Sequence, residues 1–137
     1  PFRSKVVASS GGRDVRLWSP SGGARTWREG RSETVSGIRL FPLADRALTW
    51  SARGAALVWD MATGKVAVEL QGGALRCARV FPRGDRVAVC TSDGSGVGIL
   101  DPGSGEELRR LHVQGVRDVA IFPSGDRLVS WGGAPSA

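Results

Sequence analysis

Residues 116–130 read VRDVAIFPSGDRLVS, and this stretch decides the fold. An alternating apolar run ends in Phe-Pro, a polar turn follows, and a basic residue opens a second apolar run. The Phe-Pro pair returns at intervals of 40 and then 41 residues, as Phe41-Pro42, Phe81-Pro82 and Phe122-Pro123, and Pro1 stands one period upstream. The basic residues four positions after each Pro are Lys5, Arg46, Arg86 and Arg127. The chain is therefore built from an internal repeat.

Each period holds four short runs separated by turns, and the runs before each Pro alternate as half-buried strands do. The runs before the Pro are 37–41, 77–81 and 118–122, and those after it are 6–10, 47–51, 87–91 and 128–131. The third runs are 15–18, 56–59 and 97–100, and the fourth are 24–29, 66–70 and 108–113. A period of 40 to 45 residues made of four short strands is typical of a propeller blade. We predict an all-β fold, a β-propeller of four-stranded antiparallel blades.

The chain covers about three blades, whereas closed propellers have about four to eight. We divide it into approximate repeat units 1–41, 42–81 and 82–122, with an incomplete unit 123–137. We therefore expect a partial propeller, whose remaining blades come from the same chain or from a second chain. An open arc would expose strand edges, which invite pairing with other strands.

Composition indicates the setting in which the chain works. The net charge is +6, and the many arginines are scattered. Cys77 and Cys90 form no CxxC motif, and Cys90 lies in an apolar run where a buried free thiol is usual. No apolar run is long enough to span a membrane, so we expect no membrane partner. We predict an intracellular, cytoplasmic location, with the nucleus as the alternative.

Several residues resemble the WD-repeat β-propeller family in phase with the repeat. Trp59-Asp60, followed by Thr63-Gly64-Lys65, is similar to the family's third-strand Trp-Asp and its turn. Trp18 keeps the Trp and Asp101 keeps the Asp, while residues 116–130 look like the first strand, Pro turn and second strand. The resemblance implies structural repeat positions at Trp18, Trp59, Asp60, Asp93, Asp101 and His112. Gly12 and Arg53 replace the family's Asp in the first two repeats, so we expect packing to hold the blades.

The sequence offers little for catalysis. His112 is the one histidine, no GxSxG motif accompanies it, and we assign it a structural role. The glycine-rich residues 94–98 fall on a predicted hairpin turn rather than before a helix, so they do not predict a nucleotide site. Asp45, Asp85 and Asp126 recur beside an Arg, which suits turn formation and local charge pairing. We expect no enzyme activity, no catalytic residue, no cofactor and no metal site.

Two groups of residues are candidates for partner binding. Lys5, Arg46, Arg86 and Arg127 should lie at equivalent heights and form an arc near one rim. Trp27, between Arg25 and Arg28 in a fourth run, is the candidate for an exposed anchor, because Trp and Arg are enriched in interface hot spots. We expect Trp50 and Trp131, which share one place in the repeat, to pack between blades.

The function predicted from these features is that of a protein-protein interaction scaffold, a propeller module within a larger protein or complex. One alternative is a nucleic-acid or ribonucleoprotein-associated module that uses the basic rim. A second is a sensor or regulatory domain of a larger kinase or NTPase. Fold alone does not choose among them, because propellers host many functions.

Overall fold

The computed structural model describes residues 6–9, 14–19, 23–28, 35–42, 45–51, 56–70, 75–91, 93–94 and 96–132; the side chains within 6–28 lie outside this description. These residues hold thirteen strands and no helix. The strands are β1 (Val6–Ser9), β2 (Asp14–Ser19), β3 (Gly23–Arg28), β4 (Gly37–Leu40), β5 (Arg46–Trp50), β6 (Ala56–Asp60), β7 (Lys65–Leu70), β8 (Leu75–Val80), β9 (Val87–Thr91), β10 (Val97–Leu100), β11 (Glu107–Leu111), β12 (Val116–Ile121) and β13 (Leu128–Gly132).

The strands form four antiparallel sheets in chain order. Two sheets are complete, β4-β5-β6-β7 and β8-β9-β10-β11, while β1-β2-β3 has three strands and β12-β13 has two. Each complete sheet begins with the strand before a Pro turn, so it takes its first strand from one repeat unit and the other three from the next. The predicted all-β propeller of four-stranded antiparallel sheets is confirmed.

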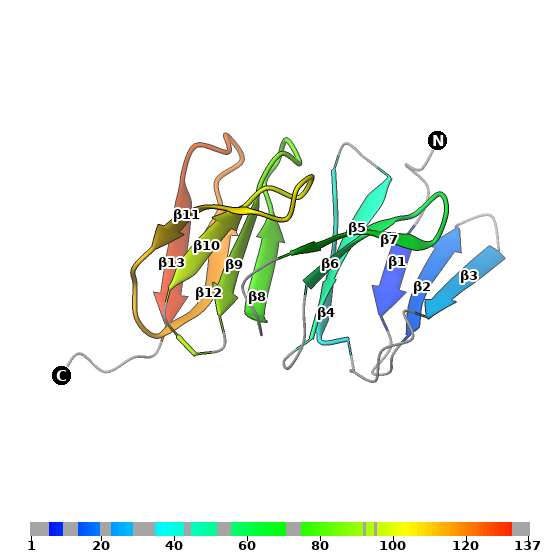
Figure 1. Cartoon of the computed structure of the whole chain (residues 1–137), viewed down its shortest axis with the longest axis horizontal. Coiled ribbons are helices and arrows are strands. Elements are labelled where there is room, and N and C mark those ends of the chain that lie inside the picture. The colour runs from blue at the N-terminus through cyan, green and yellow to red at the C-terminus, as the bar shows by residue number, and fades with distance from the viewer. Residues whose placement is uncertain are drawn as a thin grey trace.

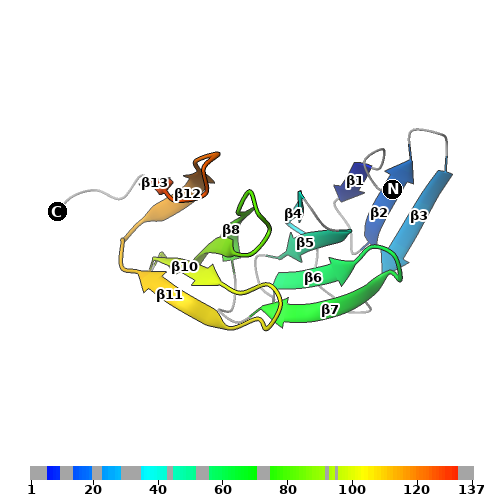
Figure 2. The ribbon, with the colours of Figure 1, turned by 90° about the horizontal axis from the view of Figure 1, so that it is seen from above.

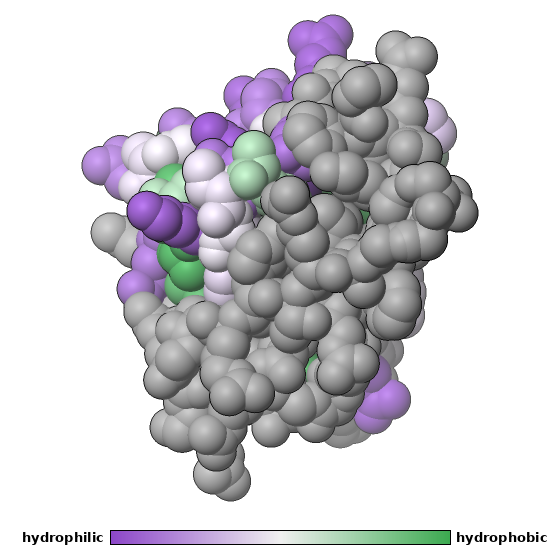
Figure 3. All heavy atoms as spheres, turned by 90° about the vertical axis from the view of Figure 1, so that its right-hand side faces the viewer, coloured by the Kyte–Doolittle hydropathy of each residue, from purple (hydrophilic) through white to green (hydrophobic). Residues whose placement is uncertain are grey.

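The sheets stand side by side along an arc (Figure 1). Seen from above, the first strands β4, β8 and β12 lie on the concave side, and the fourth strands β7 and β11 lie on the convex side (Figure 2). We call the surface formed by β4, β8 and β12 the concave wall. In the view onto the N-terminal end of the arc, hydrophilic residues dominate among the coloured ones and apolar residues form a small patch (Figure 3).

The core lies between neighbouring sheets, and β9 is buried along its whole length. One apolar cluster joins the two complete sheets through Phe41, Leu48, Trp50, Ala56, Val58 and Leu70 on one side and Leu75, Ala78, Val87, Val89 and Leu100 on the other. A second joins the sheet β8–β11 to β12-β13. A third, around Trp59, lies on the other face of the sheet β4–β7. The sheet β8–β11 therefore buries both of its faces against neighbouring sheets.

The predicted repeat positions occupy equivalent places in the sheets. Trp18, Trp59 and Leu100 pair across the sheet with residues of the preceding strand that are equivalent in the repeat. These partners are Val6, Ala47 and Val87. Trp59 is buried, and its Nε1–H donates to Thr49 Oγ1 at 2.8 Å, also buried. This bond satisfies the indole N–H inside an apolar cluster, where an unpaired donor would be costly.

The aspartates of the resemblance shape turns. Asp60 Oδ1 accepts from Ala62 N at 2.9 Å, and Asp101 Oδ1 accepts from Gly103 N at 2.8 Å. Asp93 Oδ1 accepts from Thr91 Oγ1 at 2.6 Å where β9 turns toward β10. The glycine-rich residues there form part of a β9–β10 connection, as predicted.

His112 is exposed just after β11, and its structural role stays a prediction. Two expectations need correction. Trp131 is 52% exposed because β13 lies at the edge of the two-stranded sheet, whereas Trp50 is 6% exposed as expected. Cys77 and Cys90 form a disulfide rather than leaving a free thiol, since they face each other on β8 and β9 with Cα atoms 5.1 Å apart. The cysteine argument for a reducing compartment therefore falls away.

The pair of positions that holds the disulfide, one on the first strand and one on the second, holds different residues in the other sheets. Gly37 faces Trp50 in the sheet β4–β7, and Asp118 faces Trp131 in the two-stranded sheet. A Cβ on Gly37 would lie 2.2 Å from the Trp50 ring, so only glycine lets this indole cross β4. The same place in the repeat is thus filled by Gly–Trp, Cys–Cys and Asp–Trp.

We predict that Trp59→Ala lowers the free energy of unfolding by about 3 to 5 kcal/mol, because it removes a large buried side chain. Thr49→Val should cost about 1 to 3 kcal/mol, because it leaves the indole N–H without its acceptor. Trp131→Ala is the matched control, with a change within about 0.5 kcal/mol. Urea unfolding measures all three, and equal losses at Trp59 and Trp131 would contradict the described packing.

We predict that protein purified without reductant takes up no iodoacetamide when it is denatured. After reduction both Cys77 and Cys90 should be alkylated, because they are joined and no free cysteine remains. Intact mass spectrometry before and after reduction reads out the two states. Alkylation of both residues before reduction would show that the thiols are free.

Candidate partner-binding face

The Pro turns of three successive sheets close with the same backbone hydrogen bond. The Phe N–H donates to the carbonyl of the basic residue, from Phe41 to Arg46, Phe81 to Arg86 and Phe122 to Arg127, at 3.0, 2.9 and 3.0 Å. Because antiparallel sheets connect strands at alternating ends, the turns between third and fourth strands lie at the same end. These turns lie at the same end of the strands in every sheet, and we call the surface that they form the Pro-turn face.

A glycine completes each of the last two turns and touches the preceding sheet. Gly84 and Gly125 have φ of 72° and 76°, in the left-handed region that favours glycine. Their N–H groups donate to Phe81 O and Phe122 O, both at 2.8 Å. A Cβ at Gly84 would lie 3.6 Å from Phe41, and one at Gly125 would lie 3.6 Å from Pro82. The turns therefore pack against one another along the arc.

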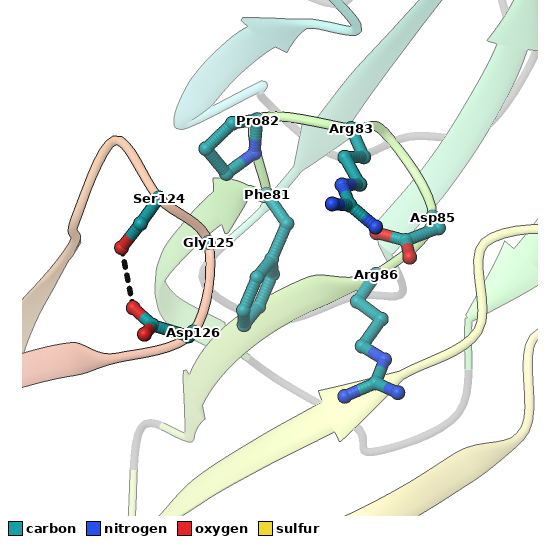
Figure 4. A pocket seen from close by; sticks show the side chains of 8 residues that line it. All are labelled: Phe81, Pro82, Arg83, Asp85, Arg86, Ser124, Gly125 and Asp126. Atoms are coloured by element: carbon teal, nitrogen blue, oxygen red, sulfur yellow. Dashed lines mark hydrogen bonds between the residues drawn. The ribbon is translucent and has the colours of Figure 1, made fainter.

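A cavity of about 210 Å³ opens between two of these turns. We call it the inter-turn pocket, and its lining residues are Phe81, Pro82, Arg83, Asp85, Arg86, Ser124, Gly125 and Asp126. Figure 4 shows the Phe81 ring between the two turns and the Arg83 side chain directed toward Asp85. Ser124 Oγ donates to Asp126 Oδ1 across the tip of the second turn. The pocket thus combines a mostly buried aromatic ring with exposed charged side chains.

The predicted basic arc is present in part. Arg46, Arg86 and Arg127 are exposed and occupy equivalent backbone positions, as the repeat predicts. Arg127 also lies over the exposed ring of Phe122, with its Cζ 5.8 Å from the ring centroid. Lys5 lies outside the described residues. Arg25, Trp27 and Arg28 lie on β3, where only the backbone is described, so Trp27 stays a prediction as an anchor.

Charges on the Pro-turn face are balanced. The described turn residues at this end include five cations, Arg46, Lys65, Arg83, Arg86 and Arg127. They also include six carboxylates, Asp45, Asp60, Asp85, Asp101, Glu106 and Asp126. Neighbouring opposite charges cancel each other's field beyond about a Debye length, roughly 8 to 10 Å at physiological salt. The face therefore offers local, specific contacts rather than a broad positive field.

A wider groove of about 720 Å³ lies between the sheet β8–β11 and the hairpin β12-β13, lined by Ile99, Leu108, Leu111, Phe122 and Leu128 with Arg86, Arg109 and Arg127 among others. This groove borders the two-stranded sheet, whereas the inter-turn pocket lies between two turns that are each closed by backbone hydrogen bonds.

Sequence reasoning missed two features of this surface. It did not single out Arg83 or Ser124, because the position directly after the Pro holds a different residue in each repeat, Leu43, Arg83 and Ser124. It also missed two arginines of the concave wall, Arg39 and Arg79, although both stand two residues before a Phe-Pro pair. Within the described ranges, no group of three His, Cys, Asp or Glu side chains could hold a metal ion. None of the described segments is a helix long and apolar enough to cross a membrane.

Four-stranded antiparallel sheets that succeed one another along an arc define this chain as a β-propeller. It is similar to the crystal structure of the WD40 β-propeller domain of Doa1, with a TM-score of 0.78 over 94% of this chain and 18% sequence identity. The chain spans 44% of the length of that matched chain. No family model and no curated protein matches the sequence. Since 885 chains of solved structures match, the likeness shows the fold and does not select a function.

We predict that Gly84→Ala lowers the free energy of unfolding by about 1 to 2 kcal/mol, because alanine pays for a positive φ that glycine adopts freely. Gly84→Asn should cost less, since asparagine tolerates the left-handed region better. The space around the position admits a Cβ, so the backbone conformation is the reason for the loss. Thermal unfolding of both variants measures it, and a larger loss for asparagine would contradict this account.

Proposed function

We propose that the chain is a protein-interaction module, a propeller segment of a larger protein or complex that holds its partner by surface recognition without covalent chemistry. The observation that carries this proposal is the inter-turn pocket. Its aromatic ring and exposed arginines are residue types enriched at protein interfaces. Because the two turns are fixed by repeated backbone hydrogen bonds, the pocket is available without a loop rearrangement. A partner side chain that enters it would contact the Phe81 ring and the charged groups around it.

The charge balance supports a protein partner over a nucleic acid. Nucleic-acid binding draws most of its affinity from phosphate contacts, which need an excess of cations on the binding surface. The Pro-turn face has about as many carboxylates as cations, so Asp85 and Asp126 would repel phosphates beside Arg86 and Arg127. A regulatory domain of a larger enzyme would use the same pocket for a segment of its own polypeptide. An intracellular location stays a prediction.

A photo-crosslinking amino acid placed at Ser124 tests the proposal in cells that express the whole protein. The expected result is a discrete adduct with another protein, which is lost when Arg83 and Arg86 are changed to Glu. The same probe at Val113, which is exposed after β11 at the other end of the sheet, is the control and should give no such adduct.

Each other result of that experiment overturns the proposal in a distinct way. A nuclease-sensitive adduct would indicate a nucleic-acid partner. An adduct within the same polypeptide would indicate a regulatory contact. Identical adducts at Ser124 and Val113 would show that the Pro-turn face is not selective.

A further inference from the structure

The concave wall has two arginines at one repeated position. Arg39 on β4 faces Leu48, and Arg79 on β8 faces Ala88, which are equivalent registers in the two complete sheets. Both side chains are half-buried, and each donates from Nη1 to the carbonyl one residue before it, Ile38 O and Ala78 O, at 3.0 Å. Two guanidinium groups are therefore held in the same way on adjacent first strands.

The two arginines have different partners. Arg79 Nη2 donates to Asp118 Oδ2 on β12 at 2.8 Å, and side-chain exposures of 26% and 30% leave this pair in contact with solvent. Asp118 Oδ1 accepts from the Val119 N–H at 2.8 Å, so both carboxylate oxygens are engaged. Arg39 instead lies over the Trp50 ring, with its Cζ 5.4 Å from the centroid. The stacking positions Arg39 without neutralising it.

The local charge is uneven as a result. Among the described side chains, the charges that act on Arg39 are those of Arg79 and Asp118, and these three groups together carry one positive charge in excess. Arg76 and Arg117 are exposed on the same strands, β8 and β12. Burial lowers the pKa of Arg39, the charge of Arg79 lowers it further, and Asp118 acts in the opposite direction. Arg39 nevertheless stays protonated, because the guanidinium does not lose its proton in proteins. A partly desolvated cation beside a like charge is stabilised by an added anion.

The two-stranded sheet β12-β13 leaves room beside these groups. Ala120 on β12 faces Val129 and so occupies the register of Arg39 and Arg79 with a small side chain. Arginine has several N–H donors in a planar fork that matches a carboxylate. Arg39 uses one N–H on a backbone carbonyl, and Arg79 uses one on a backbone carbonyl and another on Asp118, so each guanidinium keeps further donors for a ligand.

We propose that Arg39 and Arg79 form a carboxylate-binding site on the concave wall, which takes an acidic side chain or a terminal carboxylate of a peptide ligand. A carboxylate carries one negative charge, equal to the excess on Arg39, Arg79 and Asp118. A phosphate monoester carries about −1.5 to −2 at neutral pH and would meet the Asp118 carboxylate. The site is separate from the inter-turn pocket, so it goes beyond the interaction proposed for the Pro-turn face.

A labelled peptide of alternating Glu and Gly, with both ends blocked, is the probe, and fluorescence anisotropy measures its Kd. Arg39→Met keeps a long side chain over Trp50 and removes the charge, so we expect binding at least about tenfold weaker. Arg109→Met, at an exposed arginine of β11 on the convex side of the arc, is the matched control, with a change within about twofold. Equal weakening by the two variants would overturn the proposal, because it would indicate a diffuse charge effect.

Asp118→Asn tests the site even if an arginine variant fails to fold. Removal of the competing carboxylate frees Arg79 and should tighten peptide binding by about threefold to tenfold. A purely structural role for the Arg79–Asp118 pair predicts no gain, and unchanged or weaker binding would overturn the proposal. Acetate should displace the peptide at least as well as inorganic phosphate does, and preferential displacement by phosphate would overturn the choice of a carboxylate. The Ser124 cross-link does not depend on Arg39, so the two proposals can fail separately.

Discussion

The apolar contact between neighbouring sheets is the constraint on which the structure depends. Leu48 and Val58 from one sheet meet Val87 and Leu100 from the next in a single buried cluster. A four-stranded sheet with two apolar faces cannot bury both by itself, so stability resides in the succession of sheets. The turns then need only to place each sheet against the previous one. The turn that contains Gly84 does this by lying close to Phe41 of the preceding sheet. The rigid spacing of the Pro turns, and hence the inter-turn pocket, follows from this packing.

Uniform packing along the arc does not require uniform residues. One cross-strand place between the first and second strands holds Gly37 with Trp50 in one sheet and Cys77 with Cys90 in the next. In the first sheet the two strands are joined by a large ring that lies over a residue without a side chain. In the next sheet they are joined by a covalent link between two small residues. The first choice also supplies a platform for Arg39, and the second does not. The substitution therefore preserves the sheet while it changes the chemistry of the concave wall.

The repeat in the sequence predicts the strands and turns because these are local: a Phe-Pro pair, a polar turn and an apolar run lie within about fifteen residues. Pairing of side chains was harder to predict. The Cys77–Cys90 link needs the register of β8 and β9, which the 13-residue separation alone does not give. Arg79 and Asp118, 39 residues apart, meet only because β8 and β12 are adjacent first strands.

The two proposed surfaces differ in how charge is arranged, and this difference separates their roles. On the Pro-turn face each arginine of the repeat follows an aspartate, so selectivity there must come from shape and short-range contacts. On the concave wall the repeat supplies arginines without a carboxylate at the same place, and Asp118 compensates one of them from the next sheet. A half-buried excess charge interacts more strongly than an exposed one, since less water screens it. A peptide ligand with one acidic group would therefore be oriented by the wall, while contacts at the Pro-turn face would distinguish one protein from another.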